Sequence, residues 1–159
     1  MGHYGQRFLP ARALRSIGGI GDDRLESFSR LAMLTIGGEG GYLALSGDSG
    51  WRIVSSCGLP ESRSKSEFPL TLKDDVVPYA VSDAEKVTLW PFLGAFETLF
   101  VAPVVLQGET IGHLGSVSQT PLDACPYRIE ALRVLAKATG DYLEAQARIR
   151  ELLGELWNL

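Results

Sequence analysis

The order of apolar patterns along the 159-residue chain predicts an α+β fold (an α/β sandwich), in which helices flank a central antiparallel sheet. Apolar residues recur every three or four positions over residues 22–36, which is typical of an amphipathic helix. Short apolar runs separated by turns rich in glycine and proline follow over residues 42–117. A second helical pattern begins at Tyr127, and strands bounded by helices favour an antiparallel sheet with the helices packed against it.

The ends of the individual elements carry local signals. Gly37 and Gly38 are expected to end the first helix, since glycine often follows a helix C-terminus. Five strands are predicted, over residues 42–45, 51–54, 76–81, 99–106 and 110–117. The first two should form a hairpin around a Gly-Asp-Ser-Gly turn, and the last two a hairpin at Gly108. Pro103 should lie at a bulge or on an unpaired side of its strand, whereas Gly112 should allow close approach of a neighbouring element.

Composition and charge exclude several classes of protein. Hydrophobic residues make up 45% of the chain and charged residues 21%, as in ordinary globular domains. The net charge of -4 predicts no bulk attraction to nucleic acid or to an anionic membrane surface. Two cysteines can form neither a disulfide framework nor a four-ligand zinc cluster, so a reducing, cytoplasmic location is expected. Charged residues interrupt every apolar stretch before the roughly 20 residues that a membrane span needs.

The segment 99–117 has the most specific pattern in the chain: an apolar strand containing a proline, a glycine turn, and then isoleucine, glycine, one residue and leucine. This segment resembles the penultimate hairpin of GAF domains. The string Val81-Ser82-Asp83-Ala84 resembles their strand-to-loop element, and residues 132–144 are similar to their closing helix. PAS domains share the architecture but fit these strings less well. The resemblance covers residues 22–145 and implies a GAF/PAS-like central antiparallel sheet flanked by N- and C-terminal helices.

Three regions are expected along the chain. Residues 1–21 form a flexible lead or linker, residues 22–145 a GAF-like domain, and residues 146–159 an extension of the C-terminal helix. The stretch between Gly58 and Val76 leaves less room than many GAF domains use for the helices that cover their ligand cavity. The resemblance therefore implies a pocket that is small, open or absent.

Five residues are candidates for binding a small molecule. Trp90, Phe92 and Phe96 fall where the resemblance places the cavity wall, and aromatic walls suit planar ligands, although core packing explains the same residues. Asp83 is a candidate for the cavity edge, or for a turn in which its side chain bonds local amides. His113 is expected on a half-exposed strand, as a structural or solvated residue, with a haem axial ligand or a pH-responsive group as the alternatives.

No cofactor can be identified. Bilin-binding GAF domains attach the chromophore through a cysteine in the region matching residues 84–97, which contains none, and the Asn-Lys-Phe-Asp-Glu signature of cyclic-nucleotide binders is missing. The sequence contains no phosphate-binding glycine loop, nucleophile elbow or zinc-protease motif, and no metal site is expected. One GAF branch reduces free methionine sulfoxide with cysteines, so a redox role for Cys57 and Cys125 is an alternative, but the chain is not expected to be an enzyme.

The C-terminal helix carries an apolar seam typical of a coiled coil. Its members follow steps of three and four residues: Leu132, Leu135, Thr139, Tyr142, Gln146, Ile149, Leu153 and Leu156. Residues 128–143 should pack on the domain, whereas residues 144–157 need another partner. The sequence therefore predicts a homodimer through this helix, with Ile149, Leu153 and Leu156 in the interface.

These features together predict a cytoplasmic regulatory or sensory domain for signal transduction. It would bind an unidentified small molecule or partner, and its terminal helices would pass the change across a dimer. The alternative is a ligand-free dimerisation scaffold whose pocket is filled by its own aromatic residues.

Overall fold

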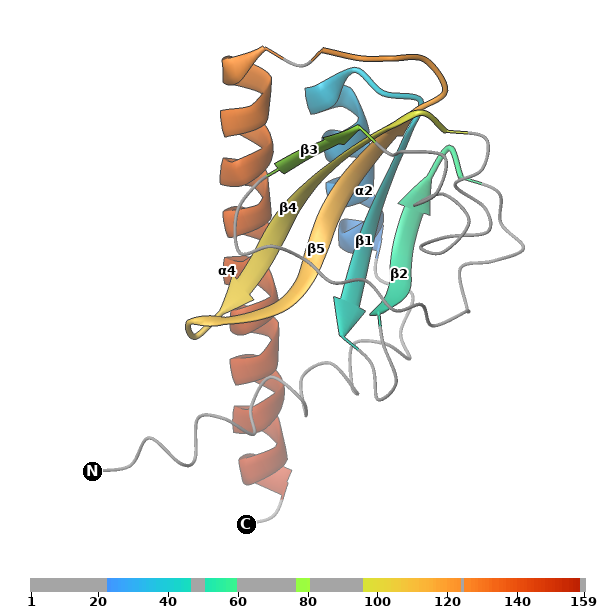
Figure 1. Cartoon of the computed structure of the whole chain (residues 1–159). Helices are drawn as coiled ribbons and strands as arrows, with labels where there is room; N and C mark the ends of the chain where they lie inside the picture. The colour runs from blue at the N-terminus through green and yellow to red at the C-terminus, as the bar shows by residue number, and fades with distance from the viewer. Residues whose placement is uncertain (1–22, 47–50, 60–76, 81–95, 124, 158–159) are drawn as a thin grey trace.

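The computed structural model describes residues 23–46, 51–59, 77–80, 96–123 and 125–157. The elements in chain order are α2 (Asp23–Ile36), β1 (Gly40–Ser46), β2 (Trp51–Cys57), β3 (Val77–Ala80), β4 (Thr98–Leu106), β5 (Glu109–Ser118) and α4 (Pro126–Trp157). The described strands form one five-stranded sheet in the order β2-β1-β5-β4-β3, and every pair is antiparallel (Figure 1). The predicted α+β architecture is confirmed.

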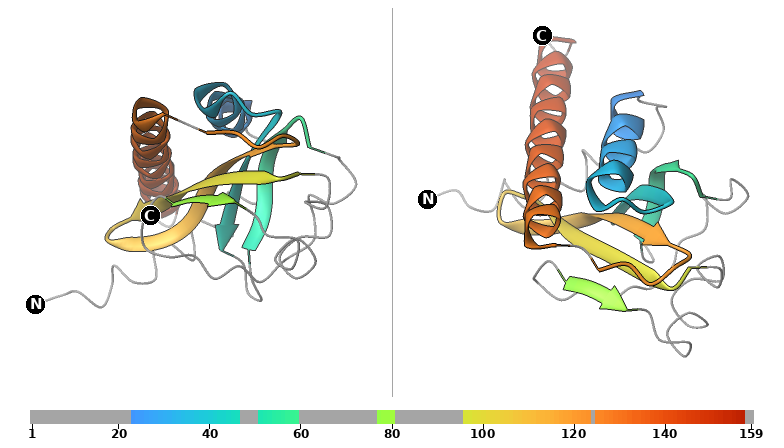
Figure 2. Two further views of the ribbon diagram at one scale, coloured as in Figure 1. Left: turned by 45° about the horizontal axis from the view of Figure 1, so that its top comes forward. Right: turned by 90° about the horizontal axis from the view of Figure 1, so that it is seen from above.

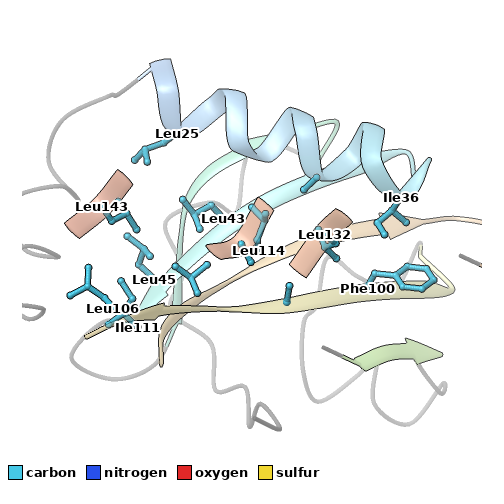
Figure 3. Packing of buried hydrophobic residues seen from close by; sticks show 14 of the residues in the cluster. Leu25, Ile36, Leu43, Leu45, Phe100, Leu106, Ile111, Leu114, Leu132 and Leu143 are labelled. Atoms are coloured by element: carbon cyan, nitrogen blue, oxygen red, sulfur yellow. The ribbon is translucent and has the colours of Figure 1, made fainter. Parts of the chain in front are cut away.

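Both described helices cover the same face of the sheet and lie side by side (Figure 2). Their inward side chains interlock with those of the strands in one core, which contains Leu25, Ala32, Ile36, Leu43, Leu45, Phe100, Ala102, Val104, Leu106, Ile111, Leu114, Leu132, Ala136, Leu143 and Ala147 (Figure 3). Removal of this apolar surface from water, at about 25 cal/mol per Å², is the main force that holds the helices on the sheet.

The C-terminus of α2 is fixed by both a glycine and a side chain. Gly37 has a φ of 81°, and its N–H donates to the carbonyl of Met33 at 2.9 Å, as expected of a glycine that ends a helix. Arg128, in the first turn of α4, donates from Nη1 to the carbonyl of Ile36 at 2.9 Å. The end of α2 is therefore tied to the start of α4, and the two helices run antiparallel.

The β4–β5 hairpin has the tight turn that the sequence predicts. Gln107 and Gly108 both have positive φ, 52° and 79°, which suits a two-residue hairpin loop in a right-twisted sheet. Next to the turn the register shifts, because Val104 pairs with Gly112 and Val105 with Thr110. The bulge leaves Ile111 unpaired and places its side chain in the helix-facing core.

The predictions for Pro103 and Gly112 hold for the described pairing. Pro103 pairs with His113 of β5, while the described pairing of β3 with β4 ends at Val101, so the proline lies beyond the end of β3. A Cβ on Gly112 would clash with the carbonyl oxygen of Ala44. Strand β1 can approach β5 closely at this point because the glycine has no side chain.

Helix α4 has 32 residues, which gives it a length of about 48 Å. Its first half packs on the sheet, and Ala147 is the last buried side chain among those that the structure describes. At Gly140 the helix backbone lies directly against the carbonyl of Val105 in β4. The helix continues unbroken through the predicted domain boundary at residue 145, and its end extends beyond the sheet (Figure 1).

Candidate functional site

The sheet has a second face, opposite the helices, which we call the far face. Apolar side chains form a separate buried cluster there: Tyr42, Ala44, Ile53, Phe96, Leu99, Val101 and Val117, with Trp51 and Leu59 packed against it. These residues alternate along their strands with the helix-facing core, as the two-residue period of a strand requires. A register shift between Leu43 and Ala44 keeps Ile53 on the far face.

Three rings meet at the centre of the far face. The ring of His113 lies edge-on to those of Tyr42 and Trp51, and each pair of centroids is 5.3 Å apart, at interplanar angles of 85° and 79°. Small partners on the neighbouring strands make this possible, because His113 pairs with Ala44, and Tyr42 pairs with Gly115. A Cβ on Gly115 would clash with the Tyr42 ring, so this glycine provides the space that the ring occupies.

Burial keeps the rings of His113 and Tyr42 uncharged. Desolvation lowers the pKa of His113 from 6.5 to about 3, so the imidazole is neutral at physiological pH. Burial also raises the pKa of Tyr42 well above its ordinary value of 10.0. The trio is therefore an uncharged aromatic cluster, and edge-to-face ring contacts of this kind stabilise by about 0.5–1.5 kcal/mol each.

Two of the five predicted ligand residues lie within the described residues, and both belong to the far face. Phe96 is buried in the same cluster as Tyr42, and His113 contacts Tyr42 directly. Asp83, Trp90 and Phe92 lie outside the described residues.

The expected environment of His113 was wrong. The sequence placed this residue on a half-exposed strand, but its side chain is fully buried, because β5 lies between β1 and β4 in the sheet. From the sequence, Tyr42 and Trp51 are expected only as strand residues. Tyr42 lies on β1, next to the strand of His113, and Trp51 lies on β2, one strand farther. Their proximity to His113 therefore depends on strand order, which local patterns do not encode.

The two cysteines do not belong to the far face. Cys57 faces α2, where its Sγ lies 4.0 Å from Sδ of Met33, and Cys125 is exposed just before α4. Both are free thiols. Within the described ranges no three His, Cys, Asp or Glu residues are grouped so that they could hold a metal ion. Nor does any described helix have the length and apolar character to cross a membrane.

The C-terminal seam divides where α4 leaves the sheet. Leu132, Thr139 and Leu143 are buried against the domain, as predicted for the first half of the helix. Beyond Ala147 the apolar residues are exposed: Ile149 by 50%, Leu153 by 50% and Leu156 by 64%. Leu152 is also exposed there, by 59%, although it is not a member of the predicted seam.

No family model and no curated protein matches the chain. Solved structures do match it. The blue-light absorbing form of the PixJ GAF domain from Thermosynechococcus elongatus has a TM-score of 0.66 at 16% identity, over 92% of this chain and 95% of that one. The second GAF domain of DevS from Mycobacterium smegmatis has a TM-score of 0.66 at 17% identity, over 90% and 99%.

An enzyme is among the similar structures as well. Free methionine-R-sulfoxide reductase from Neisseria meningitidis, in complex with its substrate, has a TM-score of 0.65 at 15% identity, over 91% of each chain. At these identities the likeness concerns the fold and does not extend to activity. The arrangement of two helices on one face of the β2-β1-β5-β4-β3 sheet is the fold of GAF domains.

Proposed function

We propose that this chain is a GAF-type sensory domain that binds a small molecule on the far face of its sheet and signals through α4 in a homodimer. The observation that carries the proposal is the change along α4 from buried to exposed apolar side chains. Its first half is part of the core, whereas its last turns leave the domain with four apolar side chains exposed. One rigid helix thus joins the sheet to a surface suited to a partner.

The composition of the far face favours an apolar or planar aromatic ligand. The rings of Tyr42, Trp51 and His113 are uncharged at neutral pH and lie among aliphatic side chains. Ligand sites are mostly apolar and aromatic, with few polar groups that fix orientation. The imidazole of His113 would supply such a group to a ligand that displaces its buried ring, since neutral imidazole has both a donor and an acceptor nitrogen.

Neither cysteine favours a redox enzyme. A sulfoxide bound on the far face would lie across the sheet from Cys57, which packs against Met33 of α2. Cys125 is exposed immediately before α4, the helix that packs on the face of the sheet opposite the far face. We therefore propose a binding module and not a catalyst.

Native mass spectrometry of the full chain as purified tests ligand and dimer together. We expect a dimer that carries a bound small molecule, whose mass is lost in Trp51→Leu. The matched control is Phe28→Leu, because Phe28 is a half-buried aromatic residue on the helix side of the sheet. A dimer without any bound mass would favour the alternative function, a dimerisation scaffold that packs its own rings on the far face.

The role of the helix end is tested with glutamine, which has a high helix propensity and so preserves α4. Leu153→Gln with Leu156→Gln should produce monomers in sedimentation velocity. Glu151→Gln with Glu155→Gln places the same residue in the same turns and should leave the dimer intact. Dimers of equal stability in both variants would contradict signalling through this helix.

A further inference from the structure

We propose that residues 10–17 of this chain dock on the exposed apolar end of α4 in the same copy, and compete there with the dimer of the proposed function. The inference rests on that dimer, because it assigns a second, intramolecular occupant to the same surface. Residues 1–22 lie outside the described residues, but the described residues show where this segment joins the domain and what surface lies beside it.

The end of α4 presents one apolar stripe, which we call the terminal stripe. Its members are between 50% and 64% exposed: Ile149, Leu152, Leu153 and Leu156. At about 100° per residue they fall within about 100° around the helix, as in a seam that accommodates one partner helix. An occupant from the same copy therefore excludes a second copy from the terminal stripe.

The start of α2 lies beside the point where α4 leaves the sheet. The guanidinium carbon of Arg24 is 5.9 Å from the centre of the Tyr142 ring, and Leu25 lies in the same core as Leu143 (Figure 3). Because the two helices run antiparallel, the end of α4 continues beyond the start of α2 (Figure 2). The chain before Asp23 therefore joins the domain next to the terminal stripe.

The length of the connection suits this position. Ile149 lies seven residues beyond Tyr142, which is about 10 Å along the helix axis. The six residue steps from Ile17 to Asp23 include three glycines, and a flexible tether of that length has an r.m.s. span of about 13 Å. Ile17 can therefore reach the first residue of the terminal stripe without stretching the chain.

Residues 10–17 have the pattern of a partner helix. Their apolar members recur at helical spacing: Pro10, Ala13, Leu14 and Ile17. Proline suits the first position of a helix. At helical rise these residues cover about 10 Å, as residues 149–156 do. In an antiparallel arrangement Ile17 comes level with Ile149, and Pro10 comes level with Leu156.

Charge favours the chain's own segment over a second copy. Residues 1–21 contain three arginines and no acidic residue, so the net charge of -4 divides into +3 on these residues and -7 on the rest of the chain. The segment is therefore attracted to its own domain, whereas two whole copies repel. A short tether also gives an effective concentration on the order of 1 mM, about a thousandfold above that of a second copy at about 1 μM.

Docking of residues 10–17 is thus an autoinhibitory contact. Both copies must release their segments before a dimer forms, so the apparent dissociation constant is the intrinsic constant divided by the square of the released fraction. A segment that is bound about three-quarters of the time raises the constant about 16-fold.

Sedimentation velocity of the full chain over a concentration series tests the competition. Leu14→Gln with Ile17→Gln removes two apolar side chains from the segment, and we expect the dissociation constant of the dimer to fall at least about tenfold. The matched control is Ala11→Gln with Ser16→Gln, which places the same residue on the other side of the segment and should change the constant less than about threefold. A weaker dimer in the first variant would show that the segment is part of the dimer interface, and would overturn the inference.

Amide hydrogen exchange, followed by mass spectrometry at a concentration where the chain is monomeric, measures the docking itself. Residues 10–17 should exchange at least about threefold more slowly in the unmodified chain than in Leu153→Gln with Leu156→Gln, which changes the terminal stripe. The matched control is Val134→Gln with Ala138→Gln, at exposed positions of α4 outside the stripe, and it should keep the slow exchange. Equal exchange in all three chains would refute the docking.

The outcomes separate this inference from the proposed function. If Leu14→Gln with Ile17→Gln leaves the dissociation constant within threefold of the unmodified chain while Leu153→Gln with Leu156→Gln gives monomers, the competition is refuted and dimerisation through α4 stands. If no variant dimerises, the proposed function fails, and the exchange of residues 10–17 alone decides whether they dock on α4.

Discussion

The burial of His113 predicts a specific loss of stability in mild acid. In the folded chain the imidazole remains neutral down to a pKa of about 3, whereas in the unfolded chain it takes up a proton near 6.5. Below about pH 6.5 the unfolded state therefore binds one proton more than the folded state. Stability that is fully present above the unfolded pKa is lost as the pH falls toward the folded pKa.

The magnitude follows from the two pKa values. Linkage makes the loss approach about 1.4 kcal/mol per pH unit well below the unfolded pKa. Between pH 7.5 and pH 5.5 the unfolded imidazole changes from about one-tenth to about nine-tenths protonated, which integrates to a loss of about 1.4 kcal/mol. Most carboxylates complete their titration below this interval, so they contribute little to the difference.

Urea unfolding at pH 7.5 and pH 5.5 measures this quantity. The chain should lose about 1.4 kcal/mol more on acidification than His113→Phe, which keeps an aromatic ring but cannot ionise. The matched control is His3→Gln, which removes the only other histidine and should preserve the loss. If His113→Phe and the unmodified chain lost equal stability, the imidazole would not be buried as the structure describes, and the reasoning would be refuted.

Two further predictions concern the helices. Leu143→Ala should lower the free energy of unfolding by about 2–5 kcal/mol, because it opens a cavity between α4 and the sheet. Leu152→Ala, at an exposed position, is the control and should lower it by under about 1 kcal/mol. Urea unfolding at concentrations where the chain is monomeric measures both values. Arg128→Met should cost about 1 kcal/mol, because the carbonyl of Ile36 loses its donor. Arg133→Met breaks only an exposed ion pair and should cost less than half as much; equal costs for the two arginines would show that Arg128 does not cap α2.

Elements with local signals could be predicted from the sequence. The turn at Gly108 needs positive φ, and Gly37 needs it after a helix, so a glycine at each position indicates the conformation. The periods of 3.6 and 2 residues then separate helices from strands between these turns. The full strand order was not predicted, because local patterns indicate only which consecutive strands form hairpins.

The candidate site depends on contacts that no local pattern contains. Trp51 and His113 are far apart in the chain and meet only because β1 lies between β2 and β5. The bulge between Leu43 and Ala44 shifts the register of β2, and a shift of one residue reverses which face a side chain occupies. The burial of His113 follows from the same long-range pairing, so a local pattern could suggest only a half-exposed strand.

Periodicity was ambiguous for α4 for a different reason. A helix that is apolar on two sides gives two sets of residues with the same spacing, and the sequence does not say which set meets the sheet. Leu132 and Leu143 lie on the sheet, while Val134 and Leu152 lie outward. The sequence seam crosses from the first set to the second, because a strict alternation of three and four residues drifts around a straight helix.

In the proposed sensor, a single layer of strands connects the far face of the sheet with the core beneath the helices. Strand β5 carries His113 on the far face and, one residue later, Leu114 in the core beneath the helices. A ligand that displaced the His113 ring would therefore move a main chain whose next side chain is tightly packed in that core. Close-packed interiors transmit such shifts because they lack free volume to absorb them. On the neighbouring strand β4, the carbonyl of Val105 lies directly against Gly140, so a shift of the sheet at that point would press on the backbone of α4. Since α4 is one unbroken helix, a small rotation at Gly140 would change the direction in which the exposed apolar residues at its C-terminal end point.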